Sequence, residues 1–219
     1  MKAEFWHDRW EQGQIGFHQD QINNHLKKHW DGLPLDKAGS VLVPLCGKTR
    51  DMNWLFKQGH EVIGVEVSAI AVDAFFTENE LAHSTVTHEN YVVKSTTGIR
   101  LFCGDFFQLH SADLGEIKAV YDRASLIALP PEMREQYAQH MSELLTAGTP
   151  ILLVTMEYPE NEMDGPPFTV GEAEVRRLYE KQFEVTLLED QDCIALNPQF
   201  KDRGLSSMHE KVYSLIKKT

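Results

Sequence analysis

The chain has 219 residues, a length suited to one large α/β domain that needs no disulfide or metal to bury a stable core. Hydrophobic residues make up 42% and charged residues 25%, the proportions of an ordinary globular protein. The net charge is −12 and no dense Lys/Arg tract occurs, which argues against the clustered positive charge that nucleic-acid or anionic-membrane partners require. We therefore expect no nucleic-acid partner and no membrane partner.

The N-terminal residues and the cysteines bear on cellular location. Residues 1–10 carry charges where a signal peptide would need an apolar segment, and no apolar run approaches the roughly 18 residues of a membrane span. Cys46, Cys103 and Cys193 are odd in number and widely spaced, without a C-x-x-C motif. This usage is typical of free thiols in a reducing compartment, so we expect a cytoplasmic protein.

No repeat or long linker divides the chain, so we expect a single domain over residues 1–219, with an N-terminal segment at 1–35 and a core at 40–219. In the N-terminal segment, helices are expected over residues 5–12 and 21–30, followed by a Pro/Gly-bearing connection from Gly32 to Gly39. His25 and His29 share a face of the second helix, but the intervening Glu of an H-E-x-x-H motif is absent. Neighbouring Asn and Lys residues suggest an exposed face there, and we expect no metal site.

The first apolar run, Val41–Leu45, ends in a Gly-containing turn and is followed by a helix over residues 51–58. A second apolar run ends on Glu66, nineteen residues after Gly47. This is the layout of a βαβ nucleotide-binding unit, in which an acid at the end of the second strand accepts hydrogen bonds from ribose hydroxyls. Any α/β protein repeats strand, helix and strand, so the spacing alone leaves the nucleotide interpretation at even odds.

The same residues discriminate among adenosine ligands. The carboxylate of Glu66 would repel a 2′-phosphate, which disfavours NADP. A G-x-G-x-x-G motif is absent, because Pro44, Leu45 and Cys46 occupy the positions where small residues admit a pyrophosphate, and this weakens the case for NAD. A ligand with adenosine but no phosphate fits better, and S-adenosyl-L-methionine is such a ligand, with S-adenosyl-L-homocysteine as its product.

The remaining elements complete an α/β pattern. Ser68 is expected to cap a helix reaching residue 79, residues 91–94 and 99–103 to form a hairpin, and Pro130 to open a helix reaching residue 146. Further strands are expected over 117–121, 151–156, 184–188 and 211–216, the last two as a late antiparallel pair, and a helix over 170–181. Strands alternating with helices predict a Rossmann-like, mainly parallel sheet covered on both faces.

Ligands of such sheets bind beyond the carboxyl ends of the strands. Four residues fall at these predicted ends: Leu45, Glu66, Asp105 and Arg123. They form the predicted site. An aromatic segment that precedes the first strand, with Trp6, Trp10 and Phe17, either packs a helix onto the sheet or forms a lid over the cofactor, and we expect both roles.

Two other classes of protein remain open on these residues. An NAD-linked oxidoreductase would share the ribose-binding acid, although the glycine motif is missing. A non-catalytic adenosine-ligand sensor would use the same pocket without an acceptor site, and would leave Phe17 and the segment Gly165–Phe168 unexplained. Cys46 could be a reactive thiol beside a helix N-terminus, but a small packed residue is the more common situation.

Seven motifs occur in a fixed order along the chain. They are Trp6-x-x-x-Trp10, Gly16-Phe17-His18, Pro44-Leu45-Cys46-Gly47-Lys48, Gly64-Val65-Glu66, Phe75-Phe76-Thr77-Glu78, Asp122-Arg123 and Gly165-Pro166-Pro167-Phe168. Together they resemble the thiopurine S-methyltransferase family, in its bacterial rather than its vertebrate form. The resemblance implies the seven-stranded class I methyltransferase fold with an antiparallel last strand. It also implies methyl transfer from S-adenosylmethionine to sulfur.

The resemblance also implies roles for individual residues. Trp10, Leu45, Glu66 and Arg123 match cofactor-contacting positions, with Glu66 on the ribose and Arg123 on a carboxylate. Arg123 could instead form a surface ion pair with Asp122 or Glu132. Asp105 and Phe106 match positions of adenine contacts, although vertebrate members lack this Asp. Phe17 matches an aromatic of the acceptor pocket, and Arg203 resembles an arginine near the acceptor or is a solvated loop charge.

Methyl transfer makes few demands on side chains, because aligning nucleophile, methyl and leaving sulfur can supply roughly 7–11 kcal/mol. An aromatic thiol is substantially ionised near neutral pH. We therefore assign no general base, although Asp8 or His18 would be the first candidates. The acceptor is expected to be a small thiol of thiopurine, aromatic or heterocyclic type, with selenium or tellurium compounds as further possibilities. A monomer is expected.

Overall fold

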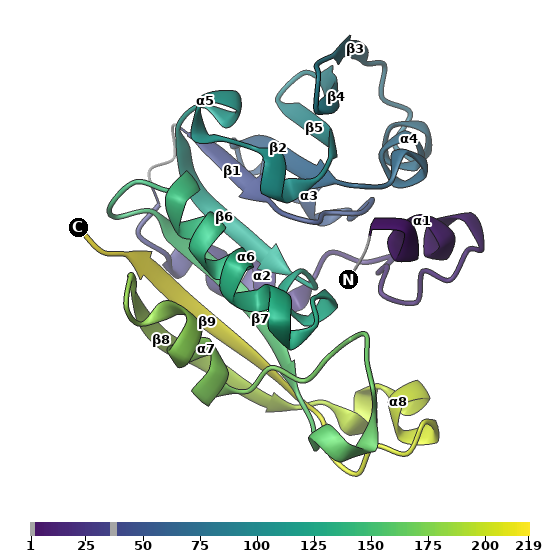
Figure 1. Ribbon diagram of the computed structural model, residues 1–219, viewed down its shortest axis with the longest axis vertical. Coiled ribbons are helices and arrows are strands. Elements are labelled where there is room, and N and C mark those ends of the chain that lie inside the picture. The colour runs from purple at the N-terminus through teal and green to yellow at the C-terminus, as the bar shows by residue number, and fades with distance from the viewer. Residues whose placement is uncertain (1–2, 36–38) are drawn as a thin grey trace. The chain divides into compact units, whose positions relative to one another are not determined.

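The computed structural model describes residues 3–35 and 39–219, so part of the expected connection Gly32–Gly39 lies outside the described residues. The chain forms two compact units, Met1–Tyr121 and Asp122–Thr219, each described by itself below (Figure 1). The boundary between them falls inside a strand, β6, which runs from Ile117 to Arg123. Within the described residues, no helix is both long and apolar enough to cross a membrane.

The first unit contains a sheet in the order β3-β4-β5-β2-β1-β6. Its strands are β1 (Ser40–Val43), β2 (Glu61–Glu66), β3 (Ser84–Thr87), β4 (Tyr91–Thr96), β5 (Ile99–Gly104) and β6 (Ile117–Arg123). The four strands β5, β2, β1 and β6 are parallel. All four residues of β1 are buried, as are the last five of β2, so these strands are covered on both faces, as parallel strands usually are.

Helices of the first unit connect and cover these strands. They are α1 (Ala3–Glu11), α2 (Asn24–His29), α3 (Asp51–Lys57), α4 (Ala69–Glu78) and the short α5 (Ser111–Leu114). The expected helix at 21–30 begins only at Asn24, because the side chain of Asn23 accepts hydrogen bonds from the backbone N–H groups of His25 and Leu26. His25 is 5% exposed, so the expected exposed face is wrong for this residue.

The second unit contains a sheet in the order β7-β9-β8, with both neighbouring pairs antiparallel (Figure 1). Its elements are β7 (Pro150–Glu157), β8 (Phe183–Asp192), β9 (His209–Lys217), α6 (Pro131–Leu144), α7 (Glu172–Tyr179) and α8 (Pro198–Asp202). Pro131 opens α6, where its missing N–H costs no hydrogen bond. The expected antiparallel last strand is confirmed, since β9 runs opposite to β7 and β8.

The number of strands differs from the expected seven. The described residues contain nine, because the two antiparallel strands β3 and β4 are added beside β5. The predicted hairpin is confirmed: Thr96 pairs with Ile99 across a two-residue turn that contains Gly98 at φ +72°. Ser68 precedes α4 as predicted, but its side chain makes no capping hydrogen bond.

Candidate functional site

The carboxyl ends of three parallel strands define the candidate site of the first unit. The register pairs Val43 of β1 with Gly64 of β2, and Glu66 of β2 with Cys103 of β5. The turn after β1, the acid that ends β2 and the residues after β5 therefore lie at one edge of the sheet. Leu45, Glu66 and Asp105 each lie at or just after the carboxyl end of one of these strands.

Glu66 is bound by backbone groups on two sides. Its Oε2 accepts a hydrogen bond from the Gly47 N–H at 2.8 Å, and its Oε1 accepts one from the Ser68 N–H at 2.8 Å. The residue is only 6% exposed, and burial raises the pKa of its carboxyl while these N–H groups partly offset that effect. Each carboxylate oxygen retains a lone pair, so the group can accept two further hydrogen bonds.

The turn between β1 and α3 is held in an unusual backbone conformation. Leu45 has φ +45° and Gly47 has φ +53°, and a non-glycine residue in this region is strained. The Cys46 N–H donates to the Val65 carbonyl at 2.9 Å, which fastens the turn to β2. Strain held in place by hydrogen bonds is common where backbone forms a ligand site.

Cys46 is a packed residue rather than a reactive one. It is 7% exposed, and burial together with the charge of Glu66 raises the pKa of its thiol well above the ordinary value. Its Sγ would lie 2.8 Å from a Cβ added at Gly64. The cysteine at position 46 therefore packs against the glycine at position 64, where β2 passes the turn.

The N-terminal aromatic segment contacts the same turn. A Cβ added at Gly47 would lie 3.2 Å from Cζ2 of Trp10, so the indole packs directly against the turn. The rings of Trp6 and Trp10 each make an edge-on contact with Phe17, with centroids 5.7 and 5.6 Å away. Trp10 is buried, whereas Phe17 is 37% exposed. The segment therefore packs against the turn, and Phe17 presents an accessible aromatic side chain.

Asp105 and Phe106 follow β5 and have different environments. Asp105 is exposed and its Oδ1 accepts the Phe107 N–H at 3.0 Å, which caps the short 3-10 turn Phe106–Gln108. Phe106 is 4% exposed and belongs to the core. A carboxylate is thus presented at the sheet edge, while the ring of Phe106 supports the turn from beneath.

Arg123 and Arg203 belong to the second unit. Arg123 ends β6 and is followed by Ala124 at φ +62°, a second strained non-glycine residue. Arg203 follows α8, is exposed, and its guanidinium carbon lies 5.6 Å from the ring centroid of Phe200. In the segment Gly165–Phe168, the Phe168 N–H donates to the Ile127 carbonyl at 2.7 Å.

Sequence reasoning missed the role of Asp51, which it treated only as the first residue of a helix. Asp51 is 1% exposed; its Oδ1 accepts the Asn23 N–H at 2.9 Å and its Oδ2 accepts the Tyr121 hydroxyl at 3.0 Å. Asp51 lies just after the turn between β1 and α3, and its two hydrogen bonds link the segment before α2 to β6. An acid in the first turn of a helix offers no signal for such distant partners.

The fold is that of the class I methyltransferases. Two solved structures share the fold. One is 1,6-didemethyltoxoflavin-N1-methyltransferase of Burkholderia thailandensis, which has bound S-adenosylhomocysteine, with TM-score 0.60, 19% identity and coverage of 99% of this chain and 87% of that chain. The other is a SAM-dependent methyltransferase of Anabaena variabilis, with TM-score 0.63, 12% identity and coverage of 99% and 95%.

Sequence relatives then identify the family. The family model described as thiopurine S-methyltransferase matches residues 1–218. The thiopurine S-methyltransferase of Nitrosospira multiformis is 46% identical over 219 residues, covering all of both chains. That of Pseudomonas paraeruginosa is 48% identical over 215 residues, covering 98% of this chain and 99% of the relative. The chain belongs to the thiopurine S-methyltransferase family, and neither an oxidoreductase nor a sensor is supported.

Proposed function

We propose that the protein transfers the methyl group of S-adenosyl-L-methionine to the sulfur of a small thiol of thiopurine, aromatic or heterocyclic type. The observation that supports this most is the buried Glu66 carboxylate, held by the Gly47 N–H beside a turn that carries no pyrophosphate motif. The carboxylate offers hydrogen-bond acceptors to ribose hydroxyls, and the turn lacks the glycine motif that admits a diphosphate.

The residues of the sheet edge fit such a cofactor. In the proposal, Glu66 binds the ribose, Leu45 and Trp10 supply apolar and backbone contact, and Asp105 accepts from the adenine amino group, supported by Phe106. Arg123 pairs with the carboxylate of the methionine portion. Phe17 and Arg203 bind the acceptor. The cofactor, when bound, supplies an activated methyl group on a sulfonium.

No general base is assigned in this mechanism, because the chain's task is to align the reactants and exclude water. His18 is nevertheless suited to accept a proton. Burial, followed by the charge of Lys48, lowers the pKa of its imidazole, which keeps the ring neutral near pH 7. Asp8 is the other candidate, on the solvent-facing side of α1.

The proposal also includes one domain over residues 1–219, a monomer, and a cytoplasmic location. The three cysteines support the location, since Cys46, Cys103 and Cys193 are all free thiols. No nucleic-acid partner is proposed, because the chain carries a net charge of −12.

Two measurements test the function. S-adenosylhomocysteine should raise the melting temperature, whereas NADH should not, because a ligand at 100 times its dissociation constant stabilises by roughly 2.7 kcal/mol. Methylation of a thiopurine or thiophenol should then be detectable with S-adenosylmethionine. Binding of the cofactor product without turnover of any thiol would favour a sensor instead.

The Glu66→Ala variant tests the site within this function. It should lose affinity for S-adenosylhomocysteine and keep its fold. Glu61→Ala is the matched control, because Glu61 is an exposed glutamate at the opposite end of the same strand. Equal affinities of the two variants would contradict the proposed ribose contact.

A further inference from the structure

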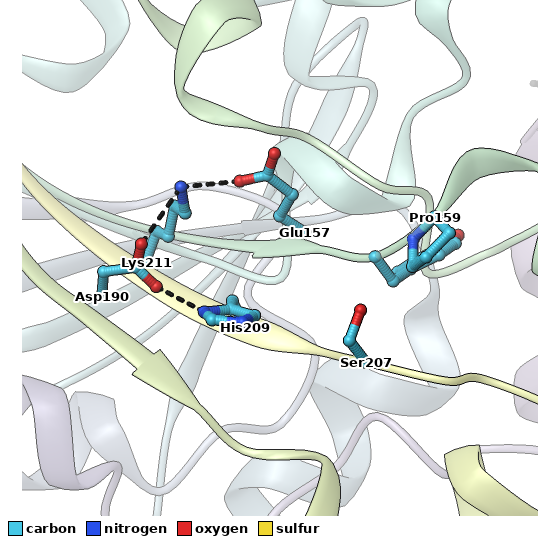
Figure 2. Close-up of a pocket in the computed structure, with 7 residues that line it drawn as sticks. Glu157, Pro159, Asp190, Ser207, His209 and Lys211 are labelled. Atoms are coloured by element: carbon cyan, nitrogen blue, oxygen red, sulfur yellow. Dashed lines mark hydrogen bonds and ion pairs between the residues drawn. The ribbon is translucent and has the colours of Figure 1, made fainter.

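A polar pocket of about 380 Å³ lies in the second unit, on the sheet β7-β9-β8 (Figure 2). Glu157, the last residue of β7, pairs with His209, the first of β9, and Asp190 of β8 pairs with Lys211. His209 and Lys211 are two residues apart and therefore project from the same face. The register thus gathers four ionisable side chains from three strands.

These side chains form a connected network. Lys211 Nζ lies 2.7 Å from Glu157 Oε2 and 3.3 Å from Asp190 Oδ2, and His209 Nδ1 lies 2.6 Å from Asp190 Oδ1 (Figure 2). The Lys211 side chain is only 12% exposed, while those of Glu157 and Asp190 are 42% and 40% exposed. Burial acts to lower the pKa of Lys211, but its bonds to the two carboxylates raise it overall. Two carboxylates therefore share one charged ammonium, which leaves a formal charge of −1.

Some acceptors in the pocket have no partner among the described residues. Asp190 uses both oxygens, but Glu157 Oε1 and His209 Nε2 make no hydrogen bond within residues 3–35 and 39–219. When His209 is neutral, donation from Nδ1 to Asp190 leaves Nε2 as an acceptor. Tyr158 is 5% exposed and its hydroxyl donates to the Pro167 carbonyl at 2.7 Å, so Pro159 is the apolar residue that the pocket offers to a ligand.

We propose that this pocket binds a small planar organic cation with N–H donors, of the amidinium or aminoheterocycle type. The excess negative charge attracts a cation, the free acceptors on Glu157 and His209 receive its N–H groups, and Pro159 contacts its ring. An anion would face two carboxylates. A metal ion is disfavoured because the ammonium of Lys211 already stands between them. The proposal does not rest on the proposed methyl transfer.

Benzamidine, benzamide and benzoate share one shape and carry charges of +1, 0 and −1, so they test the proposal directly. The full chain, labelled with ¹⁵N, is titrated with each up to roughly 10 mM, which nearly saturates a ligand with a dissociation constant near 1 mM. Benzamidine should shift the amide resonances of residues 157–159, 190 and 207–211, and benzoate should not. Equal binding of benzamide and benzamidine, or no localised shifts, would overturn the proposal.

Single substitutions test which carboxylates of the pocket contribute to benzamidine binding. Glu157→Gln should weaken benzamidine about tenfold, the effect of one charge-assisted hydrogen bond. Asp190→Asn removes the second charge and should also weaken it. The control is Glu135→Gln, which removes an exposed carboxylate paired with Arg177 elsewhere in the same unit. Unchanged affinity in both pocket variants would overturn the site. A dispersed ¹⁵N amide spectrum of each variant shows that it is folded, so the result is independent of the proposed methyl transfer.

Discussion

At the scale of single residues, Glu66 combines deep burial with carboxylate oxygens that each keep a lone pair for a further hydrogen bond. Its two N–H donors come from Gly47 and Ser68. The turn and the residue before α4 are therefore held against the carboxylate by these hydrogen bonds. Such preorganisation lowers the cost of ordering the site on binding.

This environment predicts a pH dependence of cofactor binding. Because burial raises the pKa of Glu66 in the free protein, and ribose hydroxyls favour the ionised form, binding should lower that pKa. The affinity for S-adenosylhomocysteine should therefore fall as pH decreases through the pKa of Glu66. Calorimetric titration between pH 4 and 8 measures this, and Glu66→Gln should bind weakly with a flat profile. A wild-type affinity independent of pH would argue against the contact.

Asp122 predicts a pH dependence of stability. It is 1% exposed and accepts the Tyr137 hydroxyl at 2.8 Å, and burial raises the pKa of its carboxyl from 3.8 to about 6. Tyr137 of α6 and Tyr179 of α7 face it, together with Ser125. Between these two pKa values the folded protein binds a proton that the unfolded chain has released, so this group's contribution to stability is lost as pH rises from about 4 to 6.

The expected size of this loss is about 3 kcal/mol. Urea unfolding of the wild type and of Asp122→Asn should therefore give free energies whose difference changes with pH over that window, with the wild type relatively more stable at the acid end. A difference that stays constant from pH 4 to 7 would show that the carboxyl is ionised throughout.

Residue spacing foretold part of this site. The position of Glu66 after Gly47 predicted a second strand that ends on this acid, and β2 does end at Glu66. The positive φ of Leu45 could not be foreseen, since leucine gives no signal for that conformation. The burial of Phe106 could not be foreseen either, because two adjacent phenylalanines offer no clue to which of them faces the core.

At the scale of elements, the turn after β1 governs the candidate site. Gly47→Ala should weaken S-adenosylhomocysteine, because the added Cβ meets Trp10 at 3.2 Å and φ is +53°. The backbone strain alone costs about 1–2 kcal/mol. Gly148→Ala is the matched control, with φ +83° and nothing within 4 Å of the added Cβ. Both variants should lose stability in urea, but only the first should lose ligand affinity. Similar affinities would mean that the turn tolerates displacement.

The N-terminal aromatic segment predicts different effects on thiol binding and on cofactor binding. Phe17→Ala should raise KM for the thiol several-fold and change cofactor affinity little, because the Phe17 ring is exposed whereas Trp10 beside it is buried. Phe56→Ala removes a ring of similar exposure, 38% against 37%, from α3. Steady-state kinetics with thiophenol compares them. An equal change in both variants would point to general destabilisation.

The spacing of apolar residues did not predict the strand β3 or the end of β8. All four residues of β3 are exposed, so no apolar alternation marks this strand in the sequence. The strand β8 runs to Asp192, well beyond the expected 188, because an irregularity between Leu187 and Glu189 shifts the register and lets the polar residues 189–192 continue pairing with β9. Those polar residues resemble a loop when only the sequence is read.

At the scale of the whole molecule, the apolar runs sufficed for the α/β fold class, while the chemistry needed the family motifs. The pocket around Lys211 escaped sequence analysis for a simple reason. Its four ionisable residues come from three strands, and only the antiparallel register brings them together.

The strand β6 predicts cooperative unfolding. It contributes residues 117–121 to the first compact unit and 122–123 to the second, so neither unit can open without disturbing a shared strand. All four tryptophans, at positions 6, 10, 30 and 54, belong to the first unit. Tryptophan fluorescence therefore follows one unit and far-UV circular dichroism follows both. Their urea transitions should coincide. Separate midpoints would show independent domains and contradict the proposed single domain.

Gly64 has a consequence for how this chain tolerates mutation. A methyl group at this position would lie 2.4 Å from Leu101 Cδ2, 2.8 Å from Cys46 Sγ and 2.9 Å from Met52 Sδ, so even alanine must displace buried side chains. A genetic screen for lost methylation would score such changes with those at Glu66, although glycine carries no functional group. We therefore expect position 64 to tolerate as few substitutions as a ligand-binding position does.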